Sequence, residues 1–209
     1  MSHEVGLSRL RVYVDGFNLY HGLMEHSKTR AYRWLDLRAL ATRFLLPGET
    51  LEGVTYFTAI APWSKAKADK HRRYIAALKH FGVEVEEGRF QKDERLCLAD
   101  CGQLFSYHVE KLTDVNISTR MVRDAVLDRF DRAMLVTGDS DQTPTIRAIR
   151  DLAPTKQVVL LFPPRRFSAD LQGAAHDVVA SLGERDLKAC QLPARIEAPG
   201  RIIEKPSNW

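Results

Sequence analysis

The sequence predicts an α/β fold in which a parallel β-sheet carries helices on both faces. Short segments that are apolar throughout, such as 54–60 and 157–163, alternate with segments whose apolar residues recur at helical spacing. A strand without polar alternation is buried on both faces, as a central strand of a parallel sheet is. The 209 residues, of which 44% are hydrophobic, are enough for one complete core.

Each element has its own signal in the sequence. Strands are predicted where short runs are apolar or alternate in polarity, at 10–16, 54–60, 83–90, 132–138 and 157–163. Helices are predicted at 36–45, 65–80 and 113–130, and a further helix follows the strand at 132–138. The first of these helices starts with Asp36, a residue type that caps helices. The third has four apolar residues on one face: Ile117, Met121, Val122 and Ala125.

The sequence carries no signal for a membrane or for secretion. There is no run of 18 or more apolar residues, and the N-terminus lacks a basic stretch followed by an apolar one. We therefore expect a cytoplasmic protein that makes no contact with a membrane. Three cysteines, an odd number, indicate thiols or a metal site rather than a disulfide framework.

Positive charge is concentrated locally. The net charge is only +4, yet segment 65–80 contains six Lys or Arg and one Asp. Such a run is either a solvated helix face or a surface that contacts phosphates. A second cluster follows the strand at 157–163, and Lys111 either reaches a phosphate or pairs with Glu110. The candidate nucleic-acid-binding residues are Lys65, Lys67, Lys70, Arg72, Arg73, Lys111, Arg165 and Arg166.

Acidic residues follow several of the predicted strands. In open parallel sheets, ligands bind beyond the carboxyl ends of the strands. Asp15 ends the first strand, and Asn18 follows three residues later. Asp139 and Asp141 follow the strand at 132–138, and Asp114 lies near the start of the helix at 113–130. These carboxylates, which are distant in the sequence, are expected to meet at one edge of the sheet.

Carboxylates that lie this close together suit only a few kinds of ligand. Crowded carboxylates raise one another's pKa values unless a cation neutralises them. Mg²⁺ or Mn²⁺ suits oxygen ligands, and one or two such ions can polarise a phosphodiester and activate water. The alternative is that Asp15 only forms a turn, that Asp114 and Asp139 only cap helices, and that Asn18 only shapes its loop.

Three segments resemble the NYN domain, a branch of the PIN-like metal-dependent ribonucleases. They are "VYVDGFNLYHGL", "EKLTDVNIS" and "LVTGDSDQTPTIRAIR", in this order, and the similarity covers about 10–179. The resemblance implies a Rossmann-like, PIN-like sheet. It also implies an acidic metal-binding set, with Asn18 as its polar partner: Asp15, Asp114, Asp139 and Asp141. Relatives often have an apolar residue where this chain has Gln142, which we interpret as altered packing rather than lost activity.

The expected organisation is a single NYN (PIN-like) domain over 8–182, with a cysteine-containing insertion at about 91–107 and a C-terminal tail at 183–209. The tail packs either on the domain or on another subunit of a homo-oligomer. In the insertion, the spacing of Cys97, Cys101 and His108 allows zinc, with Cys190 as a remote fourth ligand. Free thiols in an exposed hairpin or loop are the favoured alternative.

The predicted function is metal-dependent hydrolysis of RNA, single-stranded or structured, at a Mg²⁺ or Mn²⁺ site. The basic residues would hold the RNA backbone, since phosphate contacts give affinity without sequence choice. Two alternatives remain open. One is a non-catalytic RNA-binding or regulatory module, and the other is a Toprim-like or small-molecule phosphohydrolase, although a Toprim domain has a glutamate where this chain has Asp15.

Overall fold

The computed structural model describes residues 8–97, 101–207 and 209. Its centre is a six-stranded sheet in the order β3-β2-β1-β6-β7-β8, and all neighbouring strands are parallel. The strands are β1 (Ser8–Asp15), β2 (Glu49–Thr58), β3 (Glu84–Glu87), β6 (Arg132–Val136), β7 (Gln157–Phe162) and β8 (Asp177–Ser181). The predicted fold class is therefore confirmed.

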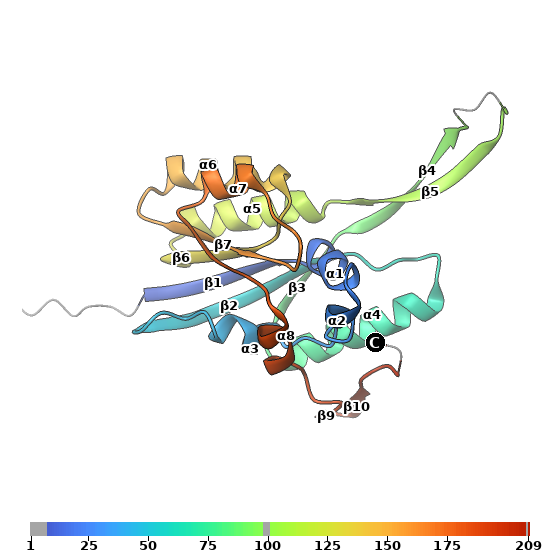
Figure 1. The fold of residues 1–209 in the computed structure, drawn as a ribbon, viewed down its shortest axis with the longest axis horizontal. Helices are drawn as coiled ribbons and strands as arrows, with labels where there is room; N and C mark the ends of the chain where they lie inside the picture. Colours follow the sequence, from blue (N-terminus) through green and yellow to red (C-terminus); the bar gives the residue numbers. More distant parts are fainter. Residues whose placement is uncertain (1–7, 98–100, 208) are drawn as a thin grey trace, which may run out of the picture.

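Helices cover both faces of this sheet (Figure 1). One face carries α5 (Thr113–Val126), α6 (Thr143–Leu152) and α7 (Ala169–Ala174). The other carries α1 (Gly16–Met24), α3 (Leu37–Thr42), α4 (Lys65–His80) and α8 (Glu184–Ala189), with the short α2 (Ser27–Arg30) beside α1. No helix among the residues described is long and apolar enough to cross a bilayer.

Alternate residues of the strands supply the two cores. In β1, Val12 and Val14 belong to the core under α3 and α4, whereas Tyr13 belongs to the core under α5. In β6, Met134 and Leu135 divide in the same way. Because both faces are buried, residues 12–14 and 133–136 are apolar without alternation, and each large side chain contributes about 1.5–3 kcal/mol on burial.

One predicted helix is confirmed in its bounds, and two are shorter than expected. Helix α4 has the predicted bounds. Helix α3 ends at Thr42 rather than at 45, although Asp36 caps it as predicted by accepting from the backbone N–H groups of Arg38 and Ala39, both at 2.9 Å. Helix α5 ends at Val126 rather than at 130, because Asp128 adopts a left-handed backbone with φ 54°. A residue in that conformation ends a helix.

The predicted strand at 83–90 is wrong as a single element. The chain leaves the sheet at Gly88, whose N–H donates to the Thr58 carbonyl at 2.7 Å. Beyond it, β4 (Arg89–Leu96) and β5 (Leu104–Lys111) form an antiparallel hairpin that projects away from the sheet (Figure 1). The predicted insertion thus lies in a hairpin, whose cysteines are the half-buried Cys97 and the exposed Cys101.

The zinc site allowed by the cysteine spacing is not formed by the part of the chain that the structure describes. Cys190 is buried in the core, and His108 stacks on Trp63 with ring centroids 4.0 Å apart. No group of three potential metal ligands among residues 8–97, 101–207 and 209 includes a cysteine. Cys190 belongs to a segment that packs on the main core, and Cys97 and Cys101 are free thiols between β4 and β5, in agreement with the favoured alternative.

The C-terminal segment packs back on the domain. After α8, the antiparallel strands β9 (Arg195–Ala198) and β10 (Arg201–Glu204) place Ile196 and Ile203 in the core shared with α3 and α4. The Trp34 indole N–H donates to the Pro193 carbonyl at 2.9 Å. The ring of Trp209 lies 6.2 Å from that of Trp34 and 5.5 Å from that of Tyr74, centroid to centroid. The sequence patterns did not predict α1, β8 or this terminal hairpin.

Candidate metal centre

Three aspartates converge where β1, β6 and α5 meet at the carboxyl edge of the sheet. Asp15 is the last residue of β1, Asp139 follows the adjacent β6, and Asp114 lies in the first turn of α5. One carboxylate oxygen from each lies within 4.8 Å of those of the other two. Asp15 is only 3% exposed, and the other two are half-buried. The predicted meeting of distant carboxylates is thus seen in the structure.

Glycines next to two of these aspartates allow other segments of the backbone to approach closely. A Cβ on Gly16 would lie 2.5 Å from the Phe57 carbonyl oxygen, and one on Gly138 would lie 2.7 Å from the backbone of Arg166. Neither position has room for a side chain without movement of the backbone. In the pairs Asp15-Gly16 and Gly138-Asp139, the glycine is therefore required by lack of space, whereas the aspartate supplies the carboxylate.

Hydrogen bonds hold the Asp15 carboxylate in place. It accepts from the backbone N–H of Asn18 at 3.0 Å and from the Thr137 hydroxyl at 2.8 Å. The side-chain oxygen of Asn18 accepts from the Gly138 N–H at 2.9 Å, and Thr137 Oγ1 accepts from the Asp139 N–H at 3.1 Å. Asn18 and Thr137 thus join the loop after β1 to the loop after β6.

Asp114 is positioned by the turn that begins α5. Leu112, just before the helix, has a left-handed backbone with φ 82°, which is rare for a residue with a branched side chain. Glu110 accepts from the Thr113 N–H at 3.0 Å. The fully buried Gln142 donates to the Asp114 carbonyl at 3.3 Å and accepts from the Ser118 hydroxyl at 3.1 Å. Gln142 therefore ties the loop after β6 to α5 at Asp114.

Asp141 lies outside the group of three. Its side chain is exposed, and its backbone N–H donates to the Asp139 carboxylate at 3.1 Å. Asp139 thereby caps the short helical turn Ser140–Gln142, as a capping residue does. Asp141 still contributes negative charge, since it is one of the carboxylates that raise the pKa of Asp114.

The negative charges of the three carboxylates are not compensated by nearby cations of the described chain. Burial raises the pKa of Asp15, against the hydrogen bonds from Asn18 and Thr137. Burial, followed by the charges of Asp15 and Asp139, raises the pKa of Asp114 to about 6. Within the described ranges, none of the three carboxylates forms an ion pair with Lys or Arg. Three oxygen donors with no counter-charge fit a hard divalent cation such as Mg²⁺ or Mn²⁺.

A cavity of about 180 Å³ opens at this group. It is lined by Asp15, Phe17, Asn18, His21, Glu110, Thr113, Asp114, Asp139 and Arg166. Arg166 pairs with Glu25 through one terminal nitrogen, while its buried Nε has no hydrogen-bond partner. Phe17 and His21 were missed as site residues, although their spacing of four places them on one face of α1.

The predicted basic residues are dispersed. Arg166 is the only one of the eight that lines the cavity. Lys65 and Arg72 both pair with Asp69, at 2.6 and 3.3 Å, so part of the α4 charge run is a solvated, self-paired face. Lys67 and Arg73 on α4, together with Lys111 and Arg165, are exposed, and Lys70 is half-buried. The structure does not bring these residues together at one point.

Comparison with known proteins gives the family. The model of the NYN domain family matches residues 9–182. The chain belongs to the NYN domain family. This confirms the resemblance found in the three sequence segments, and the six-stranded parallel sheet agrees with a PIN-like fold.

Two individual proteins are also similar to this NYN protein. The 6-hydroxy-3-succinoylpyridine 3-monooxygenase HspA of Pseudomonas putida is 30% identical, over 96% of this chain and 75% of that protein. A crystal structure of a protein of unknown function from Vibrio parahaemolyticus has a TM-score of 0.60 at 22% identity. It covers 88% of this chain and 98% of that one, so the two share a fold.

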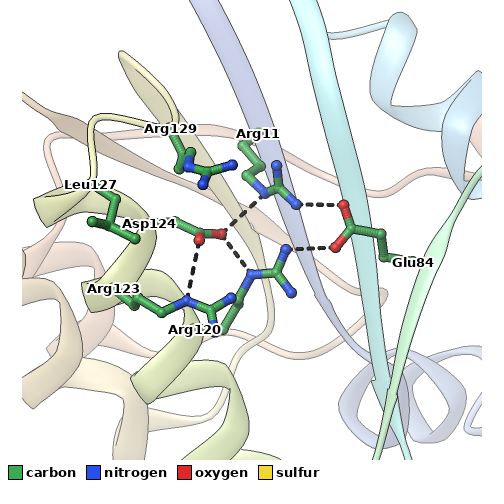
Figure 2. Close-up of a pocket in the computed structure, with 7 residues that line it drawn as sticks. All are labelled: Arg11, Glu84, Arg120, Arg123, Asp124, Leu127 and Arg129. Carbon is green, nitrogen blue, oxygen red and sulfur yellow. Dashed lines mark hydrogen bonds and ion pairs between the residues drawn. The ribbon is translucent and has the colours of Figure 1, made fainter.

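A second, larger cavity of this NYN domain lies toward the other end of α5. It measures about 360 Å³ and is lined by Arg11, Glu84, Arg120, Arg123, Asp124, Leu127 and Arg129. Figure 2 shows Asp124 facing Arg120 and Arg11, at 2.7 and 3.2 Å, while Glu84 bridges the same two arginines at 2.5 and 2.6 Å. These pairs connect β1, β3 and α5, so this cluster stabilises the fold.

Proposed function

We propose that this protein is a metal-dependent ribonuclease that hydrolyses phosphodiester bonds of RNA. The observation that carries the proposal is the group formed by Asp15, Asp114 and Asp139, whose carboxylate oxygens lie within 4.8 Å of one another and pair with no Lys or Arg among the described residues. Membership of the NYN family supports a nuclease. Burying carboxylates without compensation is costly, and a bound cation removes that cost.

Asp15, Asp114 and Asp139 would hold one or two Mg²⁺ or Mn²⁺ ions, with Asp141 adding charge at the rim. Such an ion polarises a phosphodiester and lowers the pKa of water. Asn18 and Thr137 keep the Asp15 carboxylate in one orientation. Arg166, whose half-buried side chain lines the cavity, would supply positive charge for a phosphate bound there. The exposed Lys and Arg residues of α4, with Lys111 and Arg165, would contact the RNA backbone more weakly.

The test is cleavage of defined RNAs by the purified protein with Mg²⁺, with Mn²⁺ or with EDTA. We expect cleavage that requires metal and is lost in Asp139→Asn. Asp151→Asn is the matched control, because Asp151 is an exposed aspartate on α6, away from the cavity. Binding of RNA without cleavage would favour a non-catalytic module. Turnover of mononucleotides alone would favour a small-molecule phosphohydrolase, and either result would overturn the proposal.

A second candidate follows from the relative that is named as a monooxygenase. Identity of 30% over 96% of this chain allows a shared activity, namely monooxygenation of 6-hydroxy-3-succinoylpyridine. That reaction needs dioxygen and a two-electron reductant besides the substrate. Oxygen uptake with 6-hydroxy-3-succinoylpyridine and NADH or NADPH measures it directly. Uptake that depends on the pyridine, in a preparation that leaves all RNAs intact, would replace the ribonuclease by an oxygenase.

A further inference from the structure

Four rings form a continuous row from the acidic cavity to the base of the β4–β5 hairpin. We call Phe17, Phe90, Trp63 and His108 the aromatic row. Phe17 of α1 lines the cavity, and its ring centroid lies 5.6 Å from that of Phe90 on β4. The Trp63 ring lies 4.6 Å from that of Phe90 and 4.0 Å from that of His108 on β5, centroid to centroid.

The two inner rings have a structural role that explains their presence. Phe17 and Phe90 are half-buried and meet edge to face at 90°, which fixes the root of the hairpin to α1. The two outer rings are different. Trp63 is 47% exposed, and His108 is also exposed, so their burial contributes little to the core. The planes of Trp63 and His108 are only 25° apart, as in a stack that a further flat ring can extend.

Positive charge accompanies the outer rings. Lys67 lies in the first turn of α4, which begins just after Trp63, and it is exposed. Lys92 lies directly opposite His108 in the hairpin, on the same face of the ribbon. Lys92 pairs with Glu94 at 3.1 Å, but both side chains are more than half exposed, and such pairs contribute little. The surroundings of the outer rings thus suit a ligand that combines flat rings with negative charge.

We propose that Trp63 and His108 form a stacking platform for unpaired bases, so that the substrate of the metal centre is single-stranded RNA. The inference rests on the proposed function and names its substrate class. In a duplex the faces of the bases are already covered by their neighbours, whereas unpaired bases are free to stack on aromatic side chains. Phe17 connects the platform to the cavity, which places the stacked bases close to the scissile phosphate.

The test measures binding separately from cleavage. In an Asp139→Asn background, the Kd for a short unpaired RNA and for the same strand in a duplex is compared between Trp63, Trp63→Ala and Trp63→Tyr. Loss of one base–aromatic stack weakens binding by roughly tenfold. We expect that loss for the single strand in Trp63→Ala, near-complete rescue in Trp63→Tyr, and no change for the duplex. In the active protein, Trp63→Ala should raise KM for single strands and leave kcat unchanged.

Tryptophan fluorescence gives a direct signature. Stacking of a base quenches an indole, and we expect quenching by the single strand that disappears in Trp63→Ala. Of the other two tryptophans, Trp34 is buried in the core, and the half-buried Trp209 packs on Trp34 and Tyr74. Unchanged binding in Trp63→Ala, equal weakening for single strand and duplex, or no rescue by tyrosine would each overturn the platform. Failure of the ribonuclease proposal is distinguishable, since the active protein would then cut no RNA whatever the binding results show.

Discussion

Helix α5 carries a carboxylate near each of its ends, and the two ends handle negative charge in opposite ways. Asp124, near the C-terminal end, is buried and has arginine nitrogens at 2.7 and 3.2 Å (Figure 2). Asp114, in the first turn, shares its surroundings with Asp15 and Asp139 and has no cation from the described chain. One cluster is neutralised by the fold, and the other has no neutralising cation among the residues that the structure describes.

This difference separates a stabilising site from a functional one. Burying an ion costs several kcal/mol, and a fold selected only for stability supplies a partner, as Arg11 and Arg120 do for Asp124. Where a fold leaves buried carboxylates unpaired, it gives up stability, and sites of this kind are typically functional. The larger of the two cavities is therefore the structural one, and the smaller is the candidate active site.

The largest effect is expected from Asp139→Asn, which replaces one of the three carboxylates by a neutral amide, a weaker ligand for a divalent cation. Since metal assistance contributes several kcal/mol, we expect cleavage of RNA to fall about a thousandfold or more. The metal-free protein should lose no stability, because the substitution relieves repulsion with Asp15 and Asp114. Single-turnover cleavage and thermal denaturation in EDTA measure the two effects. A large drop in Tm would show that the group is structural.

The complementary change at the other end of α5 is Asp124→Asn. It leaves Arg11 and Arg120 with less compensation and weakens the hydrogen bond from Tyr13, which donates to Asp124 at 3.0 Å. We expect a loss of about 3 kcal/mol in the free energy of unfolding, at the low end for breaking a buried pair. Mn²⁺ affinity of the folded protein should stay within about twofold. Urea denaturation and calorimetry check this, and a variant with wild-type stability but weakened metal binding would reverse the assignment.

Much of the acidic site was predictable from the sequence, because carboxylates that end parallel strands meet at one edge of the sheet. Asp15 and Asp139 are of this kind. Asp114 was a candidate from its place near the start of a helix, but only the resemblance of its segment to the NYN family favoured a site role over a helix cap. Gln142 was noticed only because relatives often have an apolar residue at this position. Its hydrogen bonds to α5 depend on tertiary packing that no local pattern encodes.

The arginine cluster and the aromatic row were not predictable in the same way. Arg11 lies between the apolar residues Leu10 and Val12 of β1, and its partner Glu84 lies on a different strand. The alternating pattern of 83–90 did not reveal where the sheet strand ends and the hairpin begins, because a strand in the sheet and a strand in a projecting ribbon have the same side-chain period of two. Trp63 lies in a loop, where a single sequence gives no information about neighbours.

The smallest effect concerns pH, and its sign should differ between the two clusters. Burial and neighbouring carboxylates raise the pKa of Asp114 from its ordinary 3.8 to about 6. In metal-free protein, Asp114 therefore contributes most to the stability of the fold below pH 4, and this contribution is lost as the pH rises through 6.

Glu84 of the other cluster behaves in the opposite way. Burial acts to raise the pKa of Glu84, but hydrogen bonds from Arg120 and the charge of Arg11 outweigh burial and lower the pKa overall. Glu84 thus stabilises the fold above its ordinary pKa of 4.5, and this is lost on acidification. The free energies of unfolding are measured from pH 4 to 7 in EDTA. As the pH rises, the stability of Asp114→Asn relative to the parent should increase, whereas that of Glu84→Gln should decrease. Parallel pH profiles for the two variants would mean that the carboxylates of both clusters are compensated alike, which would remove the basis for a metal at Asp114.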